Sequence, residues 1–290
     1  MYEVSVVKSE GDVRKAVRTS IDFVGGIEVE KGTNVVVKPN ICNSKNPGGM
    51  VNTDLRVIEA VIELIRKKDC KITIVESDNI SGTAEKRVYE TGYLAKFEEW
   101  NIDFINLSND DYREYPVAGT NLRLPLTVLD ADYFINIPKI KTCAHTLVTL
   151  GIKNLYGVFQ RKNKNSLHRH LDSVLTFLAE KVRTDLIVVD GLTCMEGNGP
   201  VVGNPICLEI IVSGKNIVSV DSTCSRIMGY DPRLISHIAK SSARGIGPIK
   251  NEDIEILGDD IDEIRTSFTP PYSLRANLRS LKSIRDIYFT

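Results

Sequence analysis

The stretch TNVVVKPNICNSKNPGGMVNTDLRVIEAVIELIRKKDCKITIVESD, residues 33–78, decides the fold. It opens with the apolar run VVV, which ends in the polar residues Lys38 and Asn40. An amphipathic segment follows, in which Asp54 is placed to cap a helix and apolar residues recur at helical spacing. A second apolar run, CKITIVESD, ends in acid and hydroxyl groups. This order predicts a β-loop-α-β unit of the Rossmann-like kind.

The rest of the chain continues the same alternation. Further apolar runs are expected to be strands, at residues 102–107, 133–137, 185–191, 208–214 and 254–260. Amphipathic stretches are expected to be helices, at residues 83–100, 171–182, 217–229 and 233–247, with Asp221 capping the third. The pattern predicts an α/β fold in which a mostly parallel central sheet carries Rossmann-like layers of helices on both faces.

The domain organisation is predicted to be simple. Turn-forming residues between about 108 and 130 indicate a small inserted sub-layer beside the main sheet. No internal repeat or low-complexity linker divides the chain. We therefore expect one α/β domain over residues 1–262 and a basic C-terminal tail over residues 263–290.

Composition argues against several classes of function. A formal net charge of -1, with 42% hydrophobic and 26% charged residues, gives no general attraction to nucleic acid or to acidic membranes. No apolar run approaches the roughly 18–20 residues of a membrane span, and the N-terminus lacks the layout of a signal peptide. A cytoplasmic protein that binds neither nucleic acid nor membrane is expected.

Polar clusters fall where strands end. In open parallel sheets, ligands bind beyond the carboxyl ends of the strands, and every cluster here follows a predicted strand. Lysine serves as a point charge for phosphate or carboxylate. The predicted ligand-binding residues at these strand ends are Lys38, Asn40, Lys139, Thr142, Lys153 and Asn154. The alternative is that the lysines form structural ion pairs with Glu76, Asp78 or Asp190.

The candidates for proton transfer lie in the same motifs. His145 is the histidine within a strand-end motif, and a histidine beside lysines tends to stay neutral and to act as a base or a metal ligand. Lys141, Asp78 and Glu196 complete the predicted catalytic set. The alternative for His145 is a purely structural role.

The glycine-rich segment MEGNGPVVGNP, residues 195–205, matches neither a P-loop nor a dinucleotide fingerprint. Its glycines permit close backbone approach to an anion, so Asn198 and Gly199 are predicted to bind ligand. A tight structural turn is the alternative.

The six cysteines form no C-x-x-C or ferredoxin-type pattern. A divalent metal ion is nevertheless considered as a cofactor, with Cys42, Cys143, Asp190 and Glu196 as candidate ligands.

Four motifs, read in order over residues 31–259, resemble the domain-of-unknown-function 362 family. They are VVVKPNI with VIEAVIELIRKKDCKITIVESD, then YFINIPKIKTCAHTLVTLGIKNLYG, then LIVVDGLTCMEGNGPVVGNP, and finally IVSVDSTCSRIMGYDP. The resemblance implies an α/β sheet protein, often from anaerobic prokaryotes and sometimes fused to a ferredoxin-like module, for which the cysteines of this sequence supply no cluster pattern. Where the family places a histidine directly after K-x-K-T, this chain has Cys143 and Ala144, with His145 following. A fainter likeness of layout links the family to the nickel-pincer lactate racemases, as an analogy only.

Two functions of different classes follow from these residues. The first is an enzyme that acts on a small anionic metabolite by isomerase or lyase chemistry, because lysines stabilise the negative charge that develops during proton abstraction. The second is a non-catalytic binding or delivery protein for a metal, a cofactor or an iron–sulfur centre. Nucleotide recognition is a third possibility without a fingerprint to support it. The expected partners are a small anionic ligand, a second copy of the chain, or a redox partner of ferredoxin type.

Overall fold

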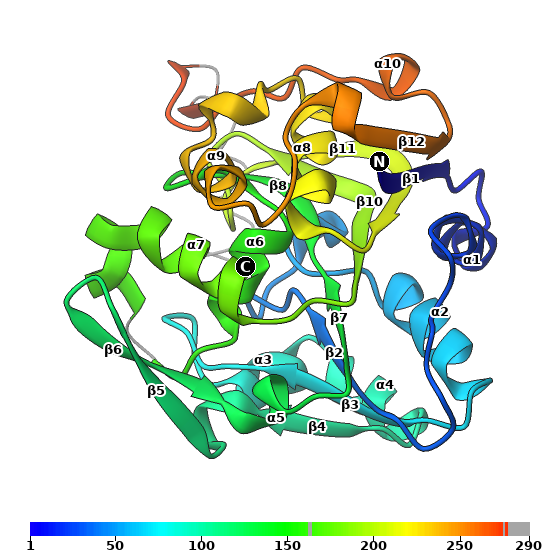
Figure 1. The fold of residues 1–290 in the computed structure, drawn as a ribbon, viewed down its shortest axis with the longest axis vertical. Helices are drawn as coiled ribbons and strands as arrows, with labels where there is room; N and C mark the ends of the chain where they lie inside the picture. The colour runs from blue at the N-terminus through cyan, green and yellow to red at the C-terminus, as the bar shows by residue number, and fades with distance from the viewer. Residues whose placement is uncertain (162–163, 275, 278–290) are drawn as a thin grey trace.

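The computed structural model of the chain describes residues 1–161, 164–274, 276 and 277 (Figure 1). The predicted tail beyond residue 277 lies outside the described residues. The strands are β1 (Tyr2–Lys8), β2 (Asn34–Pro39), β3 (Lys71–Glu76), β4 (Asp103–Asn106), β5 (Tyr112–Val117), β6 (Thr120–Pro125), β7 (Tyr133–Ile137), β8 (Lys139–Cys143), β9 (Leu147–Thr149), β10 (Leu186–Glu196), β11 (Asn204–Gly214) and β12 (Ile254–Gly258). The α-helices are α1 (Val13–Phe23), α2 (Leu55–Arg66), α3 (Ala84–Glu90), α4 (Tyr93–Glu99), α5 (Leu126–Leu129), α6 (Gly151–Asn154), α7 (Leu171–Lys181), α8 (Ile217–Ile227), α9 (Ser236–Ala243) and α10 (Ile261–Ile264).

The main sheet runs in the order β12-β1-β11-β10-β7-β2-β3-β4, with β8 beside β10 and β9 beside β8. The five strands from β10 to β4 pair in parallel, whereas β11 is antiparallel to both β1 and β10. The predicted α/β class with a mostly parallel sheet is therefore confirmed. Strands β5 and β6 form a separate two-stranded sheet within residues 108–130.

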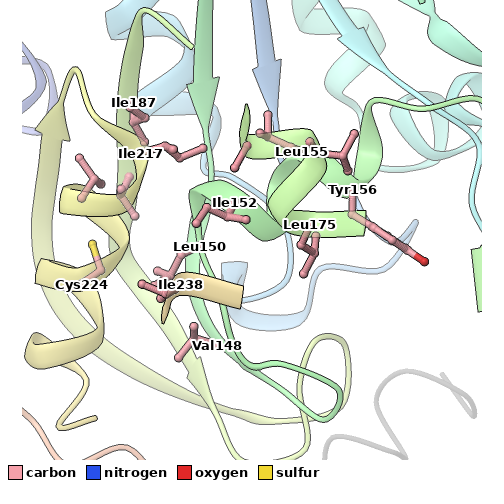
Figure 2. Packing of buried hydrophobic residues seen from close by; sticks show 14 of the residues in the cluster. Val148, Leu150, Ile152, Leu155, Tyr156, Leu175, Ile187, Ile217, Cys224 and Ile238 are labelled. Atoms are coloured by element: carbon pink, nitrogen blue, oxygen red, sulfur yellow. The ribbon is translucent and has the colours of Figure 1, made fainter. Parts of the chain in front are cut away.

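Helices cover both faces of the main sheet (Figure 1). Successive residues of a strand point to opposite sides of the sheet, so apolar side chains on both faces are buried under helices. In β2, Val35 and Val37 join the cluster that includes α1, α2 and α4, whereas Val36 joins the cluster that includes α6, α7, α8 and α9. Figure 2 shows the second cluster around the short helix α6, with Leu150, Ile152 and Ile217 of α8 among its labelled members. None of the described helices is both long and apolar enough to cross a bilayer.

Four local predictions need correction. The expected helix over residues 83–100 is two helices, because Gly92 adopts a left-handed conformation between α3 and α4. The lysine-rich segment after β7 is itself a strand, β8, and β10 continues to Glu196 through residues that were expected to be a loop. Asp221 lies inside α8, and Asn216 caps that helix instead. Strands β1 and β9 and helix α1 lie outside the predicted set.

The buried His237 on α9 makes the free energy of unfolding depend on pH. Its side chain is buried, neither ring nitrogen has a hydrogen-bond partner among the described residues, and burial lowers its pKa from 6.5 to about 4. The unfolded chain therefore binds a proton that the folded chain does not, so this contribution is complete above pH 6.5 and is lost as the pH falls toward about 4. We expect the free energy of unfolding, measured with urea, to fall less in a His237→Leu variant than in the wild type as the pH is lowered across this window. The difference should be about 2–3 kcal/mol.

The matched control is His170→Leu, because the His170 side chain is exposed. It should keep the acid sensitivity of the wild type. Equal acid sensitivity in both variants would show that His237 is not the responsible group.

Candidate functional site

A cavity of about 110 Å³ lies where β2 and β3 end. We call it the lysine cavity, because four of its lining residues are lysines that come from separate elements. Its charged residues are Lys38, Lys141, Lys153, Lys164 and Glu76. Its other residues are Asn40, Cys42, Ser77, Asn79, Thr149, Asn154, Tyr156, Gly157 and Pro200. The position agrees with the general rule that ligands of open α/β sheets bind beyond the carboxyl ends of the strands.

One lysine in this cavity is neutralised by a carboxylate. Lys38 Nζ lies 3.0 Å from Glu76 Oε2, and both side chains are buried. Burial lowers the pKa of Lys38, although the charge on Glu76 opposes that effect. Gly157 leaves room for the pair, because a Cβ there would lie 2.6 Å from Glu76 Oε1 and 2.7 Å from Lys38 Nζ. A structural ion pair is the alternative to a ligand contact that the sequence indicated for Lys38, and the structure contains that ion pair.

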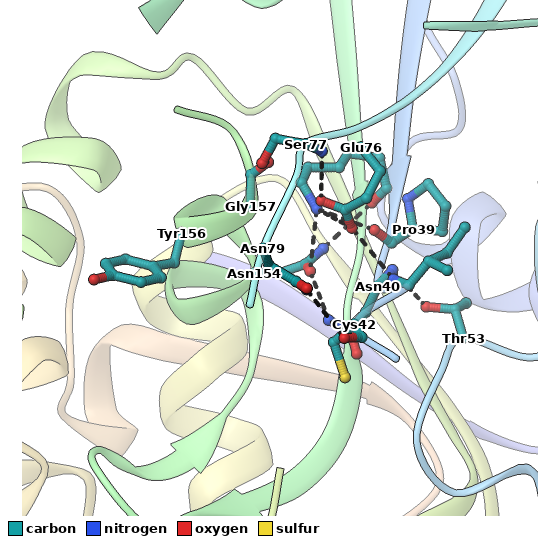
Figure 3. A network of polar contacts seen from close by, with 12 residues as sticks. Pro39, Asn40, Cys42, Thr53, Glu76, Ser77, Asn79, Asn154, Tyr156 and Gly157 are labelled. Atoms are coloured by element: carbon teal, nitrogen blue, oxygen red, sulfur yellow. Dashed lines mark hydrogen bonds and ion pairs between the residues drawn. The ribbon is translucent and has the colours of Figure 1, made fainter. Parts of the chain in front are cut away.

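Lys141 has no carboxylate partner among the described residues. Its Nζ donates to Asn40 Oδ1 at 2.7 Å and to Val51 O at 2.6 Å, and lies 3.2 Å from Cys42 Sγ. Asn40 Nδ2 in turn donates to Asn154 Oδ1 at 3.1 Å (Figure 3). The Lys141 side chain is fully buried, so its positive charge is held by neutral oxygens and a thiol.

Helix α6 carries Lys153 and Asn154 into the cavity. Asp221 fixes the start of this short helix by accepting hydrogen bonds from Gly151 N at 2.7 Å and Ile152 N at 2.9 Å. Lys153 Nζ lies 4.2 Å from the centroid of the Tyr156 ring, and no described residue accepts a hydrogen bond from it. Burial lowers the pKa of Lys153, and the charges on Lys141 and Lys38 act in the same direction.

Two further groups complete the cavity wall. Lys164, at the start of the 3-10 helix Lys164–His170, is buried and donates to Ser77 Oγ at 2.7 Å and Tyr156 O at 2.9 Å. Burial lowers its pKa to about 7. Thr149 Oγ1 is buried without a hydrogen-bond partner among the described residues. Buried polar atoms in proteins normally have a hydrogen-bond partner, and Thr149 Oγ1 is one of eleven buried side-chain atoms without one among the described residues.

The pair formed by Lys139 and Asp190 lies outside the cavity lining. Their atoms Nζ and Oδ2 are 2.6 Å apart, and both side chains are fully buried. Asp190 also accepts from Asp54 N at 2.7 Å and Leu192 N at 3.0 Å. These contacts connect β8, β10 and the start of α2. The geometry therefore supports a structural ion pair for Lys139 rather than a ligand contact. Asp190, as the partner in that pair, has the same structural role.

Two predicted catalytic carboxylates point away from the cavity. Asp78 Oδ1 accepts from Ala84 N at 2.9 Å and Asn106 Nδ2 at 2.8 Å, so it anchors the start of α3. Met195 packs with Met50 and Val51, and the next residue, Glu196, therefore faces the other side of β10, where Thr269 N donates to it at 2.7 Å. Neither carboxylate lines the cavity.

The other predicted ligand-binding residues serve local packing. Thr142 Oγ1 donates to Gly197 O at 2.8 Å, and a Cβ at Gly199 would lie 2.0 Å from Thr142 O. Asn198 bonds to Tyr272 N and Asn277, at 2.8 Å and 2.9 Å. From this glycine-rich segment, only Pro200 reaches the cavity lining. The tight-turn alternative describes the segment better than an anion cradle does.

His145 lies outside the cavity and is exposed. Its ring centroid is 4.1 Å from that of His168, and partial burial followed by the charge on Lys153 lowers its pKa. Cys143 is buried on β8; burial alone would raise the pKa of its thiol, but the charge on Lys153 and hydrogen bonds from Thr146 and His145 outweigh that effect and lower the pKa. Within the described part of the chain, no group of three or more His, Cys, Asp or Glu side chains is placed to hold a metal ion.

Several cavity residues were not predicted. Lys164 belongs to a polar loop far along the chain, and nothing in its local pattern distinguishes it from a surface lysine. Arg87 was also missed: it is fully buried and donates to Ile41 O, Gly82 O and Ser77 O at 2.9, 2.7 and 2.7 Å. It holds together the two loops that carry the cavity residues after β2 and β3.

A larger groove of about 630 Å³ lies near the opposite ends of β2 and β7. Its charged residues are largely paired with one another, as in the contacts Arg183–Asp185 and Lys215–Glu28. Ion pairs of this exposed kind are common on protein surfaces and do not indicate a ligand.

Comparisons with known proteins show which family, which relative and which solved structure the chain is similar to. The family described as "Domain of unknown function (DUF362)" matches residues 35–226. The thylakoid-associated protein sll1697 of Synechocystis sp. is 28% identical over 262 residues, which cover 86% of this chain and 81% of that protein. The lactate racemase apoprotein from Thermoanaerobacterium thermosaccharolyticum aligns with a TM-score of 0.42 at 10% identity, covering 99% of this chain and 91% of that one.

Proposed function

The chain belongs to the family described as a domain of unknown function, DUF362, and from this premise we propose that it is an enzyme that binds a small anionic metabolite, bearing a carboxylate or a phosphate, and moves a proton on it. Membership assigns no reaction, so the proposal depends on the lysine cavity. The small volume of about 110 Å³ suits a ligand of few atoms, since pockets for drug-sized ligands span roughly 300–1,000 Å³.

The observation that carries the proposal is buried positive charge in the lysine cavity that is only partly balanced by negative charge. Four lysines line the cavity against one carboxylate, Glu76. Buried charges in proteins are normally paired, and leaving an ammonium group without a counter-charge is costly. The partnerless hydroxyl of Thr149 adds a hydrogen-bond donor to the same wall. A bound anion would supply the missing negative charge and the missing acceptor.

Proton transfer is supported by the lysines whose pKa is lowered. A general base works best when its pKa lies near the operating pH, and burial of lysine is one way to reach that range. Lys164 has a pKa of about 7, and that of Lys153 is also lowered. Lys38 and Lys141 would meanwhile stabilise the negative charge that develops on the substrate. His145, which is exposed and whose pKa is lowered by partial burial and by the charge on Lys153, would pass the proton to solvent.

The test compares an anion with a neutral molecule of the same shape. Pyruvate and pyruvamide are titrated calorimetrically into the full chain, with lactate and orthophosphate as further anions. We expect pyruvate to bind at least about tenfold more tightly than pyruvamide, a difference of roughly 1.4 kcal/mol. Equal affinities for the charged and neutral molecules, or no binding of any of the three anions, would contradict the proposal.

A second measurement distinguishes an enzyme from a binding protein. In heavy water, an enzyme that moves a proton should exchange a carbon-bound hydrogen of a bound anion for deuterium, which nuclear magnetic resonance detects. Binding without exchange for every anion tested would favour the non-catalytic alternative.

A further inference from the structure

Lys164 has hydrogen-bond contacts that suit a neutral amine. Ser77 Oγ donates to Gly157 O at 2.5 Å, so the same oxygen accepts from Lys164 Nζ. Tyr156 O is the second acceptor. A neutral amine has two N–H bonds, which these two acceptors satisfy, whereas the third N–H of an ammonium group would find no acceptor among the described residues.

The charges around Lys164 favour the same form. No carboxylate contacts Nζ among the described residues, although the rings of Phe159 and Tyr156, with centroids 4.6 and 6.0 Å away, would stabilise an ammonium group. Lys38, Arg87 and Lys153 place positive charge nearby and add to the effect of burial, which Glu76 only partly offsets. A lysine desolvated beside other cations is the form of lysine that acts as a nucleophile toward carbonyl groups.

We propose that Lys164 is a covalent site for a small oxo acid: its Nζ adds to the carbonyl carbon while the carboxylate lies against Lys141 and Lys153. This inference deepens the proposed function and rests on it, because it names the substrate class of the same cavity. Lys141 and Lys153 have no carboxylate partner among the described residues and line the cavity with Lys164.

The chemical step balances without any further reactant. The lone pair of Lys164 Nζ forms a bond to the carbonyl carbon, and the oxygen takes up a proton to give a carbinolamine. The amine loses one proton, the hydroxyl leaves as water after a second protonation, and an iminium ion remains. The net change is one amine, one carbonyl and one proton converted to one iminium and one water. An ammonium group of the cavity, such as Lys153, supplies the proton.

The iminium would give a second lysine of the cavity a role in proton transfer. A positively charged nitrogen on the substrate withdraws electrons from the neighbouring carbon, which eases loss of a proton there. Lys153, having given up its proton in the preceding step, is then able to accept the one released. The sequence of steps is consistent with isomerase or lyase chemistry.

The experiment traps the iminium by reduction. The full chain is incubated with pyruvate and sodium cyanoborohydride, and intact mass and peptide mapping follow the product. We expect one reduced pyruvate per chain, on the peptide that contains Lys164. Lactate, which has a similar size and charge but no carbonyl, should give no adduct. The peptide map of the wild type decides the question even if a variant fails to fold.

Two substitutions sharpen the result. Lys164→Arg keeps a positive charge but has no nucleophilic amine, so it should lose the adduct. Lys96→Arg, at an exposed ion pair with Glu99, should keep it. No adduct on the wild type, an undiminished adduct on Lys164→Arg, or label spread over exposed lysines would overturn the inference. If pyruvate still binds by calorimetry but leaves no adduct, the covalent step fails while the proposed function stands; if no anion binds, both fail.

Discussion

Replacing Asp190 with alanine is expected to lower the free energy of unfolding by about 3–5 kcal/mol, the usual cost of breaking a fully buried ion pair. The carboxylate lies 2.6 Å from Lys139 Nζ, with neither side chain exposed. Its loss leaves the ammonium of Lys139 buried without a counter-charge. It also removes the acceptor for Asp54 N and Leu192 N, so the start of α2 and strand β10 lose their shared anchor.

Urea unfolding followed by circular dichroism measures this effect. The matched control is Asp130→Ala, which removes the partner of Arg113 from a pair with both side chains about half exposed, at 55% and 52%. An exposed pair contributes about 0–1 kcal/mol. A loss for Asp190→Ala no greater than that of the control would show that the buried pair does not anchor the sheet.

Replacing Lys141 with methionine is expected to weaken binding of a small anion by roughly 10- to 150-fold, because it removes a buried positive charge whose attraction for a nearby anion is on the order of 1.5–3 kcal/mol. Lys141 is chosen because its charge has no carboxylate partner among the described residues. Methionine fills similar volume and removes a buried charge, so the fold should be retained. The dissociation constant is measured with pyruvate by calorimetry.

The control for this variant is Lys96→Met, an exposed lysine paired with Glu99 at 2.7 Å. It should bind pyruvate as the wild type does. Thermal unfolding of both variants separates a local loss of affinity from a general loss of structure. Unchanged affinity in Lys141→Met would remove Lys141 from the site.

The sequence predicted the parts of the fold that hydrophobic periodicity determines. The strands β2, β3, β4 and β7 and the helices α2 and α7 lie within or close to their expected ranges, because each has a strong apolar pattern. The break at Gly92 was not predicted, since a glycine inside an amphipathic run does not by itself end a helix.

The sequence predicted which strand ends contribute residues to the candidate site. It did not predict in which direction each side chain points. Lys38, Asn40, Lys141, Lys153 and Asn154 reach one cavity, as the rule for parallel sheets leads one to expect. A shift of one residue along a strand reverses the direction of the side chain, and pattern alone does not fix that register. Glu196 therefore faces away while its neighbour Met195 packs against Met50 and Val51, near Cys42.

Residues contributed by irregular segments could not be placed from sequence. Lys164 reaches the cavity from a segment far from β2 along the chain, and only tertiary structure brings it to Ser77. The cytoplasmic location, a second copy of the chain and a ferredoxin-type partner remain predictions.

A crystal structure of the full chain with its tightest-binding small anion tests the central claim most directly. We predict density for the anion inside the lysine cavity, with one oxygen in hydrogen-bond contact with Lys153 and another with Thr149 Oγ1. A structure in which the anion binds elsewhere and the cavity contains only water would contradict the account.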